Sequence, residues 1–263
     1  MKKYLVIGNP INHSLSPQLH NHWIKKNNID ANYEKQILNA EDLKSVIFKI
    51  KENEINGINI TVPFKQEVIS YLDELSQDAK ETRSVNTVYL NNGQMVGHNT
   101  DIEGFKLAIK KTDYDVRGKK ILILGAGGVV SSIIFALQKM KASEILISNR
   151  TISKAENLKN LFQNLTIVNW GQIPKFDMII NATSVGLKVE EKLDLDFSQI
   201  EKGKFFYDVI YNPKQTNFLK NAKKLGNKIE NGKMMFVYQA AAAFKIWHGI
   251  YPNIDDEIDR ILD

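Results

Sequence analysis

A glycine-rich turn in the middle of the chain follows an apolar run and precedes a helical pattern. The run covers residues 121–124, the turn is Gly125-Ala126-Gly127-Gly128, and the helical pattern covers residues 129–140. In such a unit, glycines allow a tight turn and a close backbone approach, and the helix start presents N–H groups to an anion. The pattern is typical of a site for the pyrophosphate of a dinucleotide. The alternative is an ordinary turn between a strand and a helix.

The residues after the next apolar run indicate which dinucleotide would bind. This run, at 144–147, leads into Ser148-Asn149-Arg150-Thr151. A dinucleotide site places the group that faces the adenosine ribose about 20 residues after the glycines. An acidic residue there binds the free 2′-hydroxyl of NAD, whereas the planar guanidinium of Arg150 suits a 2′-phosphate. Arg150 and Thr151 therefore favour NADP over NAD, and a solvated arginine at a strand end is the alternative.

Several polar residues in the first half of the chain follow or end predicted strands. They are Ser14 and Ser16, Asn59 and Thr61 with the nearby Lys65, Asn86, and Asp101. Ligands of open α/β sheets bind at the carboxyl ends of the strands, so we expect these side chains to converge on one site. Each also has a local interpretation. Ser16 and Asp101 can serve as helix N-caps, Asn59 as a turn residue, and Lys65 as a solvated helix residue.

Two series of alternating strand-like and helical runs would position these residues. The first series has strand patterns at 3–7, 32–38 and 57–61, helical patterns at 17–26 and 41–51, and a hairpin pattern at 85–98. The second has short apolar strand patterns at 121–124, 144–147, 177–180 and 205–209. This alternation predicts an α/β protein with mostly parallel sheets covered by helices. The second series predicts a doubly wound, Rossmann-type domain.

Composition limits the classes of protein to be considered. The 263 residues are 43% hydrophobic, which is enough for a sizeable core, and they contain no cysteine, which excludes disulfides and thiolate chemistry. The net charge of +5 is scattered among acidic residues, so we expect no nucleic-acid partner. The apolar stretch at 236–247 contains Gln239 and Lys245 and is shorter than the roughly 20 residues of a membrane span. With no secretory pattern at the start, we expect a cytoplasmic protein without a membrane partner.

The chain also resembles the shikimate dehydrogenase family. The strings that carry the resemblance lie at 8–10, 13–17, 59–65, 85–87, 99–101, 125–128, 149–151, 181–186, 208–213 and 239–241. They read Gly-Asn-Pro, His-Ser-Leu-Ser-Pro, Asn-Ile-Thr-Val-Pro-Phe-Lys, Val-Asn-Thr, Asn-Thr-Asp, Gly-Ala-Gly-Gly, Asn-Arg-Thr, Asn-Ala-Thr-Ser-Val-Gly, Asp-Val-Ile-Tyr-Asn-Pro and Gln-Ala-Ala. They follow the family's order and span nearly the whole chain.

The resemblance implies a reaction and a set of site residues. The reaction is the reversible, NADPH-dependent reduction of 3-dehydroshikimate to shikimate, a step towards chorismate and the aromatic amino acids. Lys65 would be the catalytic acid/base, paired with Asp101. The implied substrate-binding residues are Ser14, Ser16, Thr61, Lys65, Asn86, Asp101, Tyr211 and Gln239. The implied NADP(H)-binding residues are Gly125, Ala126, Gly127, Gly128, Val129, Asn149, Arg150, Thr151, Thr183, Val209 and Gly232, and no metal site is expected.

We expect two domains with a cleft between them. Residues 1–101 and 237–263 would form the substrate-binding and catalytic domain, and residues 102–236 an inserted NADP-binding Rossmann domain. A quinate/shikimate dehydrogenase and a non-catalytic NADP-binding regulatory paralogue are the alternatives, and the protein could be a monomer or a homodimer. Five residues depart from the family's pattern: Ser84, Val129, Val130, Leu187 and Met234.

Overall fold

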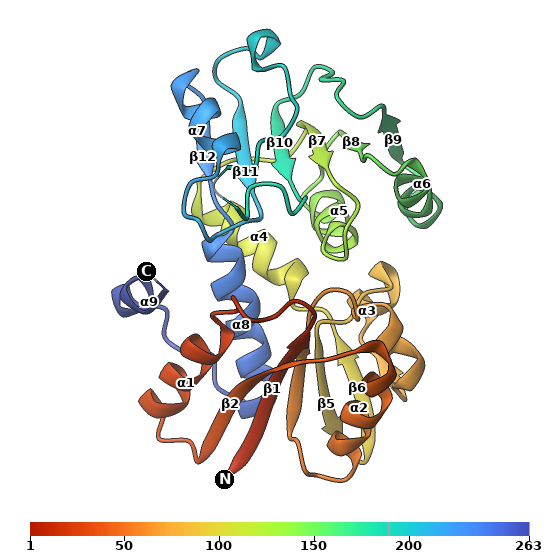
Figure 1. Ribbon diagram of the computed structural model, residues 1–263, viewed down its shortest axis with the longest axis vertical. Coiled ribbons are helices and arrows are strands. Elements are labelled where there is room, and N and C mark those ends of the chain that lie inside the picture. Colours follow the sequence, from red (N-terminus) through yellow and green to blue (C-terminus); the bar gives the residue numbers. More distant parts are fainter. Residues whose placement is uncertain (189, 263) are drawn as a thin grey trace. The chain divides into compact units, whose positions relative to one another are not determined.

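A computed structural model describes residues 1–188 and 190–262 and divides into two compact units (Figure 1). Unit 1 comprises Met1–Gly104 and Val237–Asp263, and unit 2 comprises Phe105–Phe236. Two helices include residues of both units, α4 (Asp101–Lys111) and α8 (Lys233–His248). Each unit is an α/β structure, so the predicted fold class is confirmed.

Unit 1 is built on a six-stranded sheet in the order β2-β1-β3-β5-β6-β4. Its strands are β1 (Lys2–Gly8), β2 (Ala31–Ile37), β3 (Gly57–Ile60), β4 (Glu74–Leu75), β5 (Thr87–Asn91) and β6 (Gln94–His98). Strand β1 pairs in parallel with β2 and β3, whereas β5 is antiparallel to both β3 and β6. Because β1 and β3 run in the same direction, the loops that follow them leave the same edge of the sheet. The Asn9 N–H donates to the Val62 carbonyl oxygen there, at 2.9 Å.

The helices of unit 1 bury the apolar faces that the sequence pattern provides. They are α1 (Ser16–Lys26), α2 (Leu43–Lys51), α3 (Gln77–Thr82) and α9 (Asp256–Leu262), with 3-10 turns η1 (Ala40–Asp42) and η2 (Glu67–Tyr71). In α2, Leu43, Val46, Ile47 and Ile50 recur at helical spacing and join the core under the sheet. The tight fit of unit 1 also shows at Gly57, where an added Cβ would lie 2.4 Å from the Trp247 indole nitrogen.

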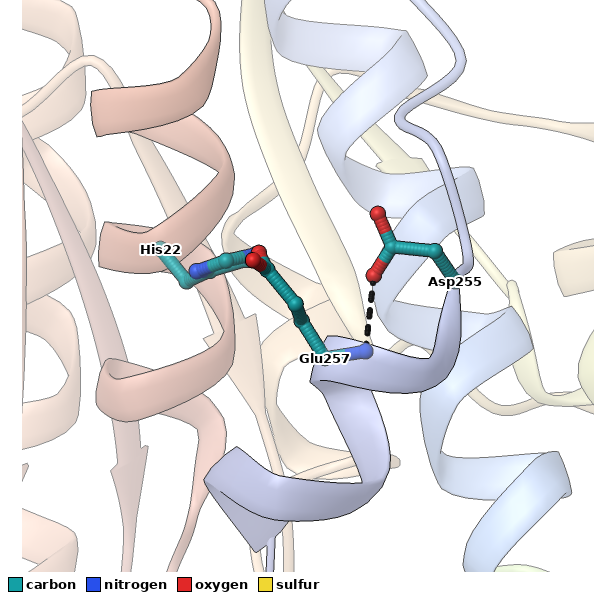
Figure 2. A group of neighbouring side chains, drawn as sticks. All are labelled: His22, Asp255 and Glu257. Carbon is teal, nitrogen blue, oxygen red and sulfur yellow. Dashed lines mark hydrogen bonds and ion pairs between the residues drawn. The ribbon is translucent and has the colours of Figure 1, made fainter.

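The C-terminal helix α9 is attached to α1 by charged side chains (Figure 2). Lys26 Nζ lies 2.6 Å from Glu257 Oε2, and His22 Nε2 lies 3.7 Å from the same oxygen. Asp255 Oδ1 accepts the Glu257 N–H at 3.0 Å. His22, Asp255 and Glu257 are close enough to share a cation, but Lys26 already supplies positive charge to Glu257. The group therefore serves to hold α9 against α1.

A histidine without hydrogen bonds lies in the aromatic part of the unit 1 core. His20 is 1% exposed, stacks on Tyr33 at 4.2 Å between ring centroids, and neither ring nitrogen has a partner among the described residues. Burial, reinforced by the neighbouring His248, lowers the pKa of His20 to about 3. The fold therefore requires the neutral form of this imidazole.

We expect His20 to make unit 1 sensitive to acid. An unfolded histidine has a pKa of about 6.5. Burial of neutral His20 therefore costs no stability above about that pH, and the free energy of unfolding declines as the pH falls towards the folded pKa. Between about pH 6.5 and 4.5 the loss would be about 2–3 kcal/mol. His20→Phe should remove this loss, as judged by urea unfolding at both pH values, whereas exposed His13→Gln should not. Equal acid sensitivity of His20→Phe and the wild type would contradict this account.

Unit 2 is a doubly wound parallel sheet in the order β12-β11-β10-β7-β8-β9. Its strands are β7 (Lys120–Leu124), β8 (Glu144–Ser148), β9 (Leu165–Val168), β10 (Met178–Asn181), β11 (Phe205–Asp208) and β12 (Lys228–Glu230). Its further helical elements are α5 (Val130–Lys139), α6 (Ile152–Leu161), α7 (Asn217–Lys224) and η3 (Phe197–Gln199). Renumbered from β7, this is the Rossmann order 3-2-1-4-5-6. The chain reverses its winding between β7 and β10, where dinucleotides bind in such sheets.

Helices long and apolar enough to cross a lipid bilayer are not found in residues 1–188 or 190–262.

Candidate functional site

The structure brings Lys65 and Asp101 together inside unit 1. Lys65 Nζ lies 2.5 Å from Asp101 Oδ2, and the side chains are only 9% and 7% exposed. Lys65 lies in the turn between β3 and η2, where Phe64 is buried and the Lys65 carbonyl accepts the Val85 N–H at 2.8 Å. The interpretation of Lys65 as a solvated helix residue is therefore wrong. Its neighbours fix its backbone, and burial shields the ion pair from water.

Asn86 connects this ion pair to the rest of the predicted substrate group. Its Nδ2 donates to Asp101 Oδ1 at 3.0 Å and to Gln239 Oε1 at 3.4 Å. Its Oδ1 accepts the Thr100 N–H at 2.8 Å. Asp101 is the first residue of α4, and its own N–H is bonded by the Asn99 side chain at 3.1 Å. Both Asp101 oxygens therefore face polar partners from other segments, which a simple N-cap would not require.

The two predicted serines lie beside each other at the start of α1, Ser14 in the preceding loop and Ser16 in the first turn. Ser14 Oγ and Ser16 Oγ are 3.2 Å apart, and the Ser16 N–H donates to Ser14 Oγ at 3.3 Å. Leu15 occupies the N-cap position of α1, and Ser16 is the first residue of the helix, so the N-cap interpretation of Ser16 is wrong. The Ser16 hydroxyl thus has no capping task.

Thr61 directly follows β3, and its N–H donates to the Ile7 carbonyl oxygen at 3.0 Å. An added Cβ on Gly8 would lie 2.4 Å from the Thr61 methyl group, so the loops after β1 and β3 are packed against each other. Lys65, Asp101, Asn86, Gln239, Ser14, Ser16 and Thr61 all belong to unit 1. Tyr211 belongs to unit 2, where its ring stacks on Phe236 at 4.6 Å.

The glycine turn of unit 2 lies between β7 and α5, as its sequence indicates. Gly125 has a φ of +108°, and an added Cβ would lie 2.8 Å from the Ala182 carbonyl oxygen. At Gly127 the nearest described atom is the same oxygen, at 3.9 Å. Helix α5 begins at Val130 with Val129 as its N-cap, whose side chain cannot accept a hydrogen bond. The turn therefore leaves room for a ligand at Gly127, and the fold itself requires glycine at Gly125.

We therefore expect alanine to affect stability at Gly125 and ligand binding at Gly127. Gly125→Ala should lower the free energy of unfolding by about 2–4 kcal/mol, because it adds backbone strain and a clash with Ala182. Gly127→Ala should change it by less than about 0.5 kcal/mol while raising the KM for NADPH, because the methyl group would occupy the ligand's space. Thermal unfolding and steady-state kinetics would separate the two effects. Similar losses of stability in both variants would contradict this reading of the turn.

The residues predicted to face the adenosine phosphate lie at the end of β8. Asn149 is partly buried, and its Nδ2 donates to the Thr151 carbonyl oxygen at 2.7 Å, which holds the turn. Arg150 and Thr151 are exposed. Lys154, on the first turn of α6, is also exposed, and its N–H donates to the Thr151 carbonyl at 3.2 Å. Sequence reasoning did not single out Lys154, although its spacing from Arg150 places a second cation near the same turn.

A buried carboxylate organises the loops after β10 and β11. Asp208 accepts hydrogen bonds from Asn181 Nδ2, the Ile210 N–H and Thr216 Oγ1 at 3.0, 3.0 and 2.6 Å. Asn181 Oδ1 in turn accepts from both the backbone N–H and the hydroxyl of Thr183. Burial raises the pKa of Asp208 to about 6, against the lowering effect of these donors. Thr183, one of the predicted NADP(H)-binding residues, is therefore held in place by Asp208 through Asn181.

Two further predicted NADP(H)-binding residues, Val209 and Gly232, are adjacent in the structure. A Cβ on Gly232 would lie within 1.9 Å of the Val209 carbonyl oxygen, so only glycine allows this approach. Sequence reasoning did not single out Asp208 or Asn181 as functional candidates. Their buried strand positions are also those of ordinary core residues, so the signal that identifies them is three-dimensional.

The fold and these two groups of residues define a class: an α/β protein with a Rossmann-type dinucleotide unit and a second unit that contains a buried Lys–Asp pair. Three family models match the chain. They describe the shikimate dehydrogenase substrate binding domain (residues 6–88), shikimate / quinate 5-dehydrogenase (106–217) and the shikimate 5′-dehydrogenase C-terminal domain (235–256).

Relatives and solved structures agree with these models. The chain is 57% identical over 262 residues to the shikimate dehydrogenase (NADP(+)) of Pelagibacter ubique, covering 100% of this chain and 99% of that one. The crystal structure of shikimate dehydrogenase from Aquifex aeolicus is 40% identical, with a TM-score of 0.92 and coverage of 100% and 97%. The Thermus thermophilus enzyme in complex with NADP(H) and shikimate is 30% identical, with a TM-score of 0.90 and coverage of 100% and 98%. The chain belongs to the shikimate dehydrogenase family.

Proposed function

We propose that this protein is an NADP-dependent oxidoreductase that catalyses the reversible reduction of 3-dehydroshikimate to shikimate. The observation that carries the proposal is the buried Lys65–Asp101 pair, bound through Asn86 to Gln239, in a chain of this family. The reaction would serve chorismate and aromatic amino acid biosynthesis. We further propose that the protein acts in the cytoplasm on small molecules, without a nucleic-acid or membrane partner.

We assign substrate binding and catalysis to unit 1, and NADP(H) binding to unit 2. This assignment uses the contacts within each unit: the convergent hydroxyl, amide and carboxylate groups of unit 1, and the glycine turn with Arg150 of unit 2. The open space at Gly127 and the exposed guanidinium of Arg150 fit a pyrophosphate and a 2′-phosphate, respectively. When bound, NADPH supplies the hydride.

Lys65 would act as the general acid of the reduction. Hydride addition to a ketone leaves negative charge on its oxygen, and a proton donor within hydrogen-bond reach lowers the barrier to this step. The Lys65 ammonium would donate the proton, and in the reverse direction the neutral amine would accept it. Asp101 would orient Lys65 through the 2.5 Å contact, and Asn86 would hold the other Asp101 oxygen.

Substrate recognition would depend on directional hydrogen bonds. Ser14 and Ser16 would donate to the substrate carboxylate. Thr61, Asn86, Asp101 and Gln239 would bind the ring hydroxyls, with Tyr211 as a further contact. A site built in this way rejects an analogue that lacks a hydroxyl, because a buried polar group would be left without a partner. We propose that this pairing sets the preference for shikimate.

Two paired assays test the proposal. Purified protein should consume NADPH, followed at the nicotinamide absorbance band, when 3-dehydroshikimate is added. In the reverse direction it should reduce NADP more efficiently with shikimate than with quinate. With shikimate, NADP should be a better cofactor than NAD because of Arg150. A protein that oxidises quinate equally well, or prefers NAD, would be the broader quinate/shikimate enzyme. No absorbance change with either acid and either cofactor would overturn the proposal.

A further inference from the structure

The two oxygens of the Asp208 carboxylate hold different segments of unit 2. Asp208 and Asn181 are 0% exposed and end the neighbouring strands β11 and β10. Asp208 Oδ1 accepts from Asn181 Nδ2 and from the Ile210 N–H, both at 3.0 Å. Asp208 Oδ2 accepts from the hydroxyl of Thr216, the N-cap of α7, at 2.6 Å. Oδ1 therefore supports the loops after β10 and β11, and Oδ2 supports the start of α7.

Asn181 carries the support of Oδ1 to Thr183. Its Nδ2 also donates to the Val185 carbonyl oxygen at 3.2 Å, and its Oδ1 accepts from the Thr183 N–H at 3.1 Å and the Thr183 hydroxyl at 2.7 Å. A backbone carbonyl only accepts and a backbone N–H only donates, so these contacts fix the orientation of the amide. The Thr183 hydroxyl in turn accepts the Val185 N–H at 3.1 Å. This hydroxyl therefore shapes the loop after β10.

The loop after β11 carries the same support to Val209 and Gly232. The Val209 N–H donates to the Asn181 carbonyl oxygen at 2.9 Å, and the Gly232 N–H donates to the Ile210 carbonyl oxygen at 3.2 Å. Gly232 also packs so closely on the Val209 carbonyl that only glycine fits there. Because Asp208 bonds the Ile210 N–H, it fixes the segment against which Gly232 lies.

These three NADP(H)-binding candidates belong to one half of the Rossmann sheet, which has two mononucleotide-binding halves. Arg150, assigned to the adenosine phosphate, follows β8 in the first half. Thr183, Val209 and Gly232 follow β10, β11 and β12 in the second half, which would take the nicotinamide mononucleotide. The Thr183 methyl group lies 3.1 Å from the position of a Cβ on Gly125, so this loop also borders the glycine turn.

We propose that Asp208 is a positioning residue for NADP(H), which fixes the loops that receive the nicotinamide half before the cofactor binds. This inference rests on the proposed function, because it takes NADP(H) as the ligand of unit 2. Asp208 acts through Asn181 and the Ile210 N–H. Without its carboxylate, cofactor binding has to order these loops, and ordering one residue lowers affinity about 10-fold.

The test is Asp208→Ala, with binding measured by isothermal titration calorimetry well below the Tm of the variant. We expect the Kd for NADPH to rise about 10-fold. The second ligand is adenosine 2′,5′-bisphosphate, which contains the adenosine phosphates and lacks the nicotinamide. Its Kd should stay within about 2-fold of the wild-type value, because Arg150 and the turn after β8 are not held by Asp208. General damage to unit 2 would weaken both ligands.

Two further variants separate positioning from a loss of stability. Asp208→Asn keeps an oxygen for Asn181 and Ile210 and offers an amide N–H to the Thr216 oxygen, so it should restore the Kd for NADPH to within about 3-fold of wild type. Thr216→Val is the matched control, because it removes the partner of Oδ2 and leaves both contacts of Oδ1. It should lower the Tm through loss of the N-cap and leave the Kd for NADPH unchanged.

Unchanged NADPH affinity in Asp208→Ala would overturn this inference. Equal losses for NADPH and adenosine 2′,5′-bisphosphate would do the same, as would Asp208→Asn or Thr216→Val binding NADPH as weakly as Asp208→Ala. The titrations contain no shikimate, so their result is separate from turnover. A wild type that oxidises shikimate keeps the proposed function even if this inference fails. A wild type that binds NADPH without turnover overturns the proposed reaction, and the affinities of the variants still decide the role of Asp208.

Discussion

Replacing Lys65 with alanine should lower kcat by about 10²- to 10⁴-fold, the usual contribution of a positioned general acid. The reason is that no other cation contacts Asp101 among the described residues, so nothing replaces the lost proton donor. NADPH binding should persist, because the residues assigned to it belong to unit 2. Steady-state turnover of 3-dehydroshikimate, together with fluorescence titration of NADPH, measures both quantities.

The matched control for Lys65→Ala is Lys51→Ala, at the exposed end of α2. It makes the same chemical change on the same unit and should leave kcat unaltered. A loss of less than about 3-fold in Lys65→Ala would remove this lysine from the mechanism. A wild type that binds NADPH but has no turnover to lose would instead favour the regulatory paralogue.

Removing Asp101 should lower the free energy of unfolding strongly. Asp101→Ala leaves the Lys65 ammonium buried without its counter-charge, and breaking a buried pair in this way destabilises proteins by about 3–5 kcal/mol. Turnover should fall as well, because Asp101 orients Lys65. Urea unfolding gives the free energy, and the NADPH assay gives the activity.

A double variant distinguishes the charge effect from a packing effect. Lys65→Met with Asp101→Leu replaces both charges with apolar groups of similar size and should recover most of the lost stability, because neither charge is then buried alone. It should recover none of the activity. Wild-type stability in Asp101→Ala would contradict the account of this pair, as would a double variant that turns over substrate.

Local pattern was sufficient for much of the fold. The glycine turn at Gly125, the strands around it and the apolar face of α2 are encoded by neighbouring residues, so spacing alone indicates them. The sequence also suggested that Lys65 and Asp101 share a site, since both follow strands. It could not show that Lys65 is buried, because that depends on Phe64 and Val85, which fix its turn. The N-cap interpretation of Ser16 was wrong for a similar reason, because Leu15 occupies the N-cap position of α1.

The sequence could not predict contacts between residues that are distant along the chain. Tyr33 reads as an ordinary strand aromatic, and the hydrogen bond from its hydroxyl to Asn59 Oδ1 depends on the parallel order of β1, β2 and β3. Asp208 likewise reads as the end of a strand, yet it holds Thr183 through Asn181. Such hydrogen bonds join residues that are distant in sequence, so no window along the chain contains both partners.

The most direct test is a crystal structure of the protein with NADP and shikimate bound together. The proposed reaction requires the substrate of unit 1 to meet the nicotinamide held by unit 2. We predict that Lys65 Nζ will lie within about 2.6–3.2 Å of the hydroxyl that is oxidised, with the nicotinamide against the carbon that bears it. Shikimate bound with Lys65 turned away from that hydroxyl, or with the nicotinamide remote from the ring, would contradict the central claim.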